Sequence, residues 1–120
     1  MHLRLRHLAL AVEDQERSRR FYEEHFGLQV SRRHDDGVLM LGDDHGFALA
    51  LGPSVGRPAL PAFLHLGFAA ATPAEVALCR EQLASAGARE VACVEEPTYV
   101  SVKVEDPDGY VVEVYWEPST

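Results

Sequence analysis

The stretch Asp106-Pro107-Asp108-Gly109-Tyr110-Val111-Val112-Glu113-Val114-Tyr115 places one carboxylate inside an otherwise apolar and aromatic run. Its first four residues predict a tight turn, because proline fixes φ, aspartates bond to nearby backbone groups and glycine accepts a positive φ. The residues that follow predict a strand buried on both faces. An ionised glutamate in such a strand is costly unless a cation neutralises it. The stretch therefore directs attention to residues that would hold a cation together with Glu113.

Length, charge and cysteine content limit the classes of protein to consider. The 120 residues suffice for a core without covalent staples, so we expect a single domain over residues 1–120. The 11 basic and 19 acidic residues give a net charge of −8, which argues against nucleic acid or an anionic membrane as the main partner. The sequence contains neither a membrane-spanning run nor the apolar segment of a signal peptide. Cys79 and Cys93 are predicted to be structural thiols among apolar neighbours, and we expect a reducing, cytoplasmic location.

The predicted elements occur in the same order in both halves of the chain. Apolar patterning and turn signals predict strands at 7–12, 28–33, 38–41 and 47–51 and a helix at 15–26 in the first half; in the second half they predict strands at 63–69, 91–94, 99–104 and 110–117 and a helix at 73–86. Each half therefore reads β-α-β-β-β. The predicted fold class is α+β, with module 1 at about 1–52, a Gly- and Pro-rich linker at 53–61 and module 2 at about 62–120.

Equivalent positions in the two copies carry the residues of greatest chemical interest. His7-Leu8 and His65-Leu66 open the two halves, 58 residues apart. The acidic turn and glycine before Glu113 recur 63 residues earlier, which makes Ala50 the counterpart of Glu113. Repeated units usually pack against one another, so we expect the equivalent strands to face each other and the site to lie where the copies meet.

Two histidines and one carboxylate form the set that binds divalent transition metals and leaves coordination positions open. A lone strand histidine is more often a hydrogen-bonded structural residue, but two at equivalent positions beside a carboxylate in an apolar strand favour ligation. Ala50 cannot bind a metal, so the predicted set is His7, His65 and Glu113. Three protein ligands are typical of a catalytic centre, since structural sites are closed.

These features, with the helical segment from Arg17 to Leu28, resemble the vicinal-oxygen-chelate superfamily, also described as the glyoxalase, bleomycin-resistance protein and extradiol dioxygenase family. The resemblance implies a curved, mostly antiparallel sheet around a metal and substrate cleft, and a homodimer. It places His7, His65 and Glu113 on metal-ligand positions, with Glu113 also the catalytic residue. The metal, Mn, Fe, Ni or Zn, stays open. Glyoxalase I and methylmalonyl-CoA epimerase carry a fourth ligand at the position of Ala50, whereas fosfomycin thiol transferases and extradiol dioxygenases use three.

The sequence therefore predicts a divalent-metal-dependent enzyme that binds a small molecule through adjacent oxygens and stabilises an oxyanion or enolate. Lyase, isomerase, thiol-transfer and ring-cleaving oxygenase reactions all remain open. Tyr115, which shares a strand face with Glu113, and Ala50 are expected to line the substrate cavity. The alternative is a protein of the bleomycin-resistance kind, which sequesters a drug or metabolite without turnover.

Overall fold

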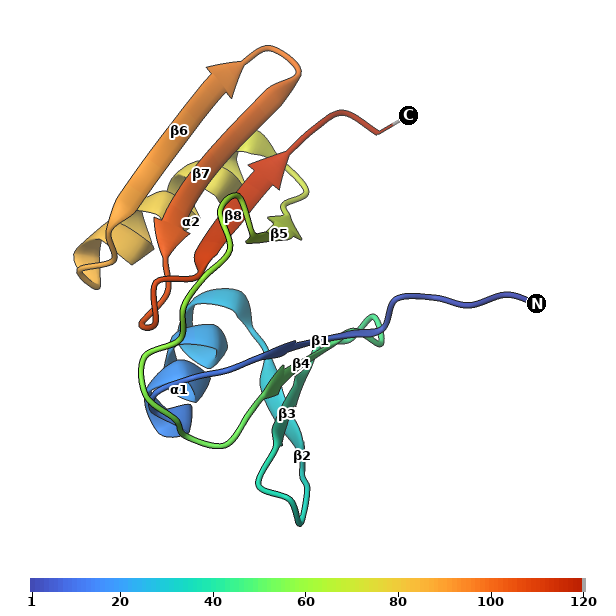
Figure 1. Ribbon diagram of the computed structural model, residues 1–120. Coiled ribbons are helices and arrows are strands. Elements are labelled where there is room, and N and C mark those ends of the chain that lie inside the picture. Colours follow the sequence, from blue (N-terminus) through green and yellow to red (C-terminus); the bar gives the residue numbers. More distant parts are fainter. Residues whose placement is uncertain (120) are drawn as a thin grey trace. The chain divides into compact units, whose positions relative to one another are not determined.

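The computed structural model describes residues 1–119, which form two compact units, Met1–Ala59 and a second unit that begins at Leu60 (Figure 1). The first unit contains β1 (His7–Leu10), α1 (Gln15–Phe26), β2 (Gln29–Arg33), β3 (Leu39–Gly42) and β4 (Ala48–Leu51). The second contains β5 (His65–Ala69), α2 (Pro73–Ser85), β6 (Glu90–Glu96), β7 (Tyr99–Glu105) and β8 (Val111–Trp116). Each unit is a β-α-β-β-β module, which confirms the predicted repetition.

Each module has a four-stranded sheet in which the first and last strands pair in parallel. The strand orders are β1-β4-β3-β2 and β5-β8-β7-β6. The β1–β4 and β5–β8 pairs are parallel, and the remaining pairs are antiparallel. The expected antiparallel majority is therefore present within each sheet, and the parallel pair lies at the edge formed by the first strand of the module, which a helix connects to the next strand.

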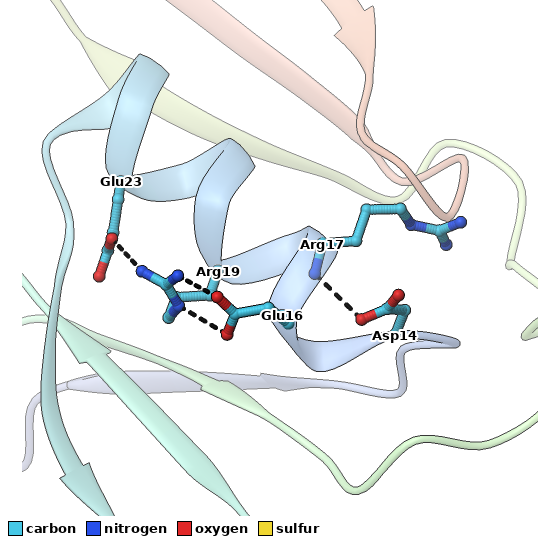
Figure 2. A network of polar contacts seen from close by, with 5 residues as sticks. All are labelled: Asp14, Glu16, Arg17, Arg19 and Glu23. Atoms are coloured by element: carbon cyan, nitrogen blue, oxygen red, sulfur yellow. Dashed lines mark hydrogen bonds and ion pairs between the residues drawn. The ribbon is translucent and has the colours of Figure 1, made fainter.

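Helix α1 begins and ends at the residues that the sequence indicates. The Asp14 carboxylate accepts a hydrogen bond from the Arg17 N–H at 3.1 Å, and Gly27 closes the helix in the left-handed region at φ 69°. On its surface, Arg19 pairs with Glu16 one turn earlier and with Glu23 one turn later (Figure 2). These pairs are charge contacts of a solvated helix face and add only modest stability.

Helix α2 begins with the predicted capping residues. The Thr72 hydroxyl accepts from the Glu75 N–H at 3.2 Å, and the Glu75 carboxylate accepts from the Ala71 N–H at 2.8 Å. The reciprocal bond thus goes to the residue before the cap, a variation on the usual capping box.

The core of the second unit lies between α2 and one face of its sheet. Val76 and Leu83 on the helix and Val102, Val112 and Val114 on the strands are all buried. Because side chains alternate along a strand, Ser101 and Glu113 lie on the other face of the sheet. The two faces thus separate the hydrophobic core from the polar residues of the candidate site.

The two cysteines differ in exposure. Both are free, but Cys79 on α2 is half-buried and Cys93 on β6 is exposed. The prediction that both are surrounded by apolar residues is wrong for Cys93, because β6 is an edge strand of its sheet. No helix in the described part of the chain has the length and apolar character that crossing a membrane requires.

Candidate functional site

The acidic turn before β8 has the predicted structure. One oxygen of the Asp106 carboxylate accepts hydrogen bonds from the N–H groups of Asp108 at 2.8 Å and Tyr110 at 2.9 Å, and Gly109 adopts φ 92°. Asp106 is itself buried. The turn is therefore fixed by its own side chain, and it sets the position from which β8 carries Glu113.

Glu113 is a buried carboxylate whose two oxygens have different partners. Only 6% of the residue is exposed. Oε2 accepts hydrogen bonds from the Ser101 hydroxyl at 2.6 Å and from the Tyr99 phenol. Burial acts to raise the pKa of Glu113, but these two bonds, with the charge of Lys103, outweigh it and hold the pKa below its ordinary value. Glu113 is therefore ionised at neutral pH.

The bond to the carboxylate also affects its donor. The pKa of the Tyr99 phenol is raised above its ordinary value, mainly by the hydrogen bond to Glu113 and secondly by burial. Tyr99 is consequently a neutral donor at neutral pH. Oε2 is occupied by two donors, and Oε1 is the oxygen that faces His65.

His65 lies beside Glu113 with its ring orientation fixed. Nε2 is 3.6 Å from Oε1 of Glu113, and Nδ1 is 2.9 Å from the carbonyl oxygen of Phe63. Since a carbonyl oxygen only accepts, this contact assigns the proton to Nδ1 of the neutral ring and the lone pair to Nε2. The nitrogen nearest the carboxylate is therefore the one able to bind a metal.

Two aromatic rings and a glycine complete this part of the sheet. Tyr115 stacks on Tyr99 with ring centroids 6.1 Å apart. Gly67 pairs with Glu113 across β5 and β8, and a Cβ added there would be 3.2 Å from Cε1 of Tyr115 and 3.9 Å from Oε1 of Glu113. The missing side chain at Gly67 thus leaves room for both of these groups.

Of the three predicted metal ligands, the second unit brings two together. His65 and Glu113 form a pair, and within residues 60–119 no third His, Cys, Asp or Glu joins them to make a group of three. His7 belongs to the first unit, where it is exposed on β1 and is paired with Ala48. Its place in the ligand set stays a prediction.

The strand registers are consistent with the equivalence of Ala50 and Glu113. Glu113 pairs with the residue two positions after His65, and Ala50 pairs with the residue two positions after His7. Ala50 is buried, with 4% exposed, and Tyr115 is half-buried. Their expected role in lining a substrate cavity stays a prediction.

Residues 4–114 match the sequence family described as the Glyoxalase/Bleomycin resistance protein/Dioxygenase superfamily. The chain belongs to this superfamily. A possible glyoxalase from Bacillus cereus is 26% identical with a TM-score of 0.81, the alignment covering 94% of this chain and 98% of that one. A glyoxalase-related enzyme from Fulvimarina pelagi is also 26% identical, with a TM-score of 0.76 and 96% and 88% of the two chains covered.

The trypanothione-dependent glyoxalase I of Leishmania major shares the fold at 24% identity, with a TM-score of 0.78 and 94% and 86% of the chains covered. Among curated protein sequences, none matches the chain significantly. The superfamily and its fold are thus established, and the reaction has to be argued from the site.

Sequence reasoning did not single out the two donors to Glu113. Tyr99 and Ser101 alternate on β7, and the cross-strand pair Lys103–Glu113 brings that face of β7 against the carboxylate. The alternation was visible in the sequence, but only the register of β7 against β8 shows which polar groups reach Glu113.

Proposed function

We propose that the protein is a metal-dependent enzyme in which His7, His65 and Glu113 hold a divalent ion that binds a small substrate through adjacent oxygens. The observation that carries this proposal is that the ionised, buried carboxylate of Glu113 lies beside His65. The ring nitrogen of His65 nearest this carboxylate, Nε2, is the one with the free lone pair. The likeness to a possible glyoxalase and to a glyoxalase-related enzyme supports an enzyme rather than a structural protein. Following the family resemblance, we propose that it works as a homodimer.

The residues present fit a metal ion. The 3.6 Å between Nε2 of His65 and Oε1 of Glu113 is too long for a hydrogen bond. It is shorter than the sum of two metal–ligand bonds of about 2.0–2.2 Å each, so one ion is able to contact both atoms. The Phe63 carbonyl and the Ser101 and Tyr99 hydroxyls orient the two ligands, as outer partners of metal ligands commonly do.

At such a site, the residues of the chain would have different roles. A bound divalent ion supplies Lewis-acid stabilisation of negative charge on a substrate oxygen. Ser101 and Tyr99 keep Glu113 ionised and direct Oε1 toward His65, and Phe63 keeps the proton of His65 on Nδ1. Ala50 provides no ligand at the position equivalent to Glu113, so the protein would contribute three donor groups and leave coordination positions for substrate oxygens.

Elemental analysis of protein purified without an affinity tag tests the proposal. We expect Mn, Fe, Ni or Zn at close to one ion per chain, and its loss in His7→Ala, His65→Ala and Glu113→Ala. His45→Ala is the matched control, because His45 is an exposed histidine between β3 and β4. It should retain the metal.

The metal found would direct the choice of substrates, with iron favouring ring cleavage, nickel or zinc an isomerisation and manganese thiol transfer. A wild-type protein that contains no metal and takes up none on reconstitution would rule out the metal-dependent reading. The family's other function, sequestration of a drug or metabolite without turnover, would then be the one to test.

A further inference from the structure

A small pocket adjoins the His65–Glu113 pair within the second unit. It has a volume of about 220 Å³, and its walls include the apolar side chains of Leu64, Val91 and Val111 together with His65 and Lys103. No acidic residue lines it among those that the structure describes. An apolar pocket with one cationic group at its wall has the composition of a ligand site that sets orientation through a single polar contact.

Lys103 is unusual in this chain. It is the only lysine of the sequence, in a protein with 19 acidic residues and a net charge of −8. It lies on β7 directly across from Glu113, whose carboxylate is already bound by Ser101 and Tyr99. Within residues 1–119, the Lys103 ammonium makes no ion pair shorter than 4.0 Å. It lies over the Phe63 ring, with 5.7 Å between Nζ and the ring centroid.

The carboxylate nearest along the strand has its own partner. Glu105, two residues after Lys103 on the same face of β7, pairs with Arg89 at 3.5 Å. The half-buried ammonium of Lys103 therefore reaches the pocket without a dedicated counter-ion from β7. Glu113, across the strand pair, is the remaining negative charge that faces it, and in the proposed site a metal ion would neutralise that charge.

Phe63 lines this pocket and has an uncommon backbone conformation. Its φ is 67°, in the left-handed region that bulky residues rarely adopt, and 87% of the residue is exposed. The ring packs edge-on against His65, with centroids 5.2 Å apart, and lies under the Lys103 ammonium. Strained residues of this kind persist where a ligand site constrains them. The result is an exposed apolar ring adjacent to a cation and to the proposed metal ligand.

We propose that Lys103 determines substrate specificity by binding an anionic group, a carboxylate or phosphonate, of a substrate whose apolar body occupies this pocket against Phe63. The inference rests on the proposed function, because His65 lines the pocket and belongs to the proposed metal site. An ammonium binds an anionic oxygen by a charge-assisted hydrogen bond, and Phe63 offers apolar contact to the body of the same molecule. The substrate class is thus a small organic anion with an apolar part.

The single lysine provides a selective reporter for the test. Reductive methylation with ¹³C-formaldehyde labels Lys103 and the N-terminal amine and preserves the charge of the lysine. Protein reconstituted with Zn²⁺, or as purified if it takes up no metal, is titrated with phenylacetate, phenylphosphonate and neutral phenylacetamide. We expect both anions to shift the Lys103 methyl signal at concentrations at least about tenfold below those needed for the amide, since a hydrogen bond between two charged groups is roughly twice as strong as one between neutral groups.

Unlabelled variants, followed by backbone amide shifts, separate the role of Lys103 from general electrostatics. Lys103→Met should lose the preference for the anions, and Lys103→Arg should keep most of it. Arg80→Gln is the matched control, because it removes one positive charge from the same unit, does not line the pocket and leaves the Arg89–Glu105 pair intact. It should bind the anions as the wild type does.

Equal binding of phenylacetate by wild type and Lys103→Met would overturn the inference, as would a loss of binding in Arg80→Gln as large as in Lys103→Met. Failure of both anions to bind the wild type at millimolar concentration would overturn it as well. The metal proposal is judged separately by metal content. A protein that takes up no metal but prefers the anions through Lys103 would keep the pocket assignment and reject the metal site.

Discussion

Ser101→Ala removes one of the two hydrogen bonds that stabilise the buried Glu113 carboxylate, so its effect on stability is open to calculation. The bond is 2.6 Å long, and Ser101 and Glu113 are only 2% and 6% exposed, so water does not replace the lost donor freely. A hydrogen bond to a charged group contributes about 1.5–3 kcal/mol. We expect the free energy of unfolding of the metal-free protein at pH 7 to fall by about this amount.

Urea unfolding followed by tryptophan fluorescence measures this loss in the relevant unit. The only tryptophan of the chain, Trp116, ends β8, the strand that carries Glu113. Its emission therefore reports on the unfolding of the second sheet. Ser85→Ala is the matched control, because Ser85 is an exposed serine at the end of α2 in the same unit. It should change stability by less than about 0.5 kcal/mol.

A double-mutant cycle with Glu113→Gln tests whether the effect of Ser101 depends on the charge of residue 113, because glutamine keeps the size of the side chain and removes its charge. If the Ser101 hydroxyl stabilises a carboxylate, Ser101→Ala should cost less in the Glu113→Gln background, since a bond to a neutral acceptor contributes only about 0.5–1.5 kcal/mol. The reasoning would be refuted if Ser101→Ala cost no more than Ser85→Ala, or cost the same with glutamine at 113 as with glutamate. Either result would mean that Ser101 fills space without supporting the charge.

Two further predictions concern the packing and the thiols of the second unit. Gly67→Ala should destabilise it by about 1–3 kcal/mol in urea, because the new Cβ would lie 3.2 Å from the Tyr115 ring. Gly56→Ala, where a Cβ meets nothing within 4 Å, should be nearly neutral when unfolding is followed by circular dichroism, which reports on both units. Equal effects of the two by circular dichroism would contradict the crowding argument. Burial raises the pKa of the Cys79 thiol, so at pH 7.5 iodoacetamide should alkylate the exposed Cys93 first, and the slow reaction of Cys79 should accelerate at higher pH as its thiolate forms. Mass spectrometry of wild type and Cys93→Ala checks the order, and a faster reaction at Cys79 would show that its burial is not maintained in solution.

The features that the sequence predicts well are those in which a residue acts on its own backbone. Gly27 ends α1 because the left-handed region suits glycine, and Asp106 fixes its turn with bonds to residues two and four positions later. Such interactions depend on spacing along the chain, and spacing is visible in the sequence. The β-α-β-β-β repetition was predictable for the same reason, since each element carries its own periodicity and stop signals.

The features that the sequence does not predict depend on how strands pair with one another, or on backbone conformations that the type of residue does not indicate. Nothing in the type of Phe63 indicates φ 67°, because phenylalanine rarely adopts it. The exposure of Cys93 follows from the position of β6 at the edge of the sheet, which is a matter of strand order. The sequence did not identify Ser101 and Tyr99 as donors to Glu113, because a shift of one residue in the pairing of β7 with β8 would place both side chains on the opposite face of the sheet.

The same register explains why only one copy of the repeat carries a carboxylate. In the second unit, Glu113 lies across from Lys103, with Ser101 two residues before that lysine as a donor. In the first unit, Ala50 lies across from Met40, and the residue two positions before Met40 is Val38.

A glutamate at position 50 would have neither a cation opposite it nor a hydroxyl at the position that corresponds to Ser101, and Ala50 itself is 4% exposed. Burying an ionised group under those conditions costs far more than the few kcal/mol that a single contact returns. A buried glutamate at position 50 would therefore require changes on β3 as well as on β4. The asymmetry between Ala50 and Glu113 is thus a property of two neighbouring strands in each module.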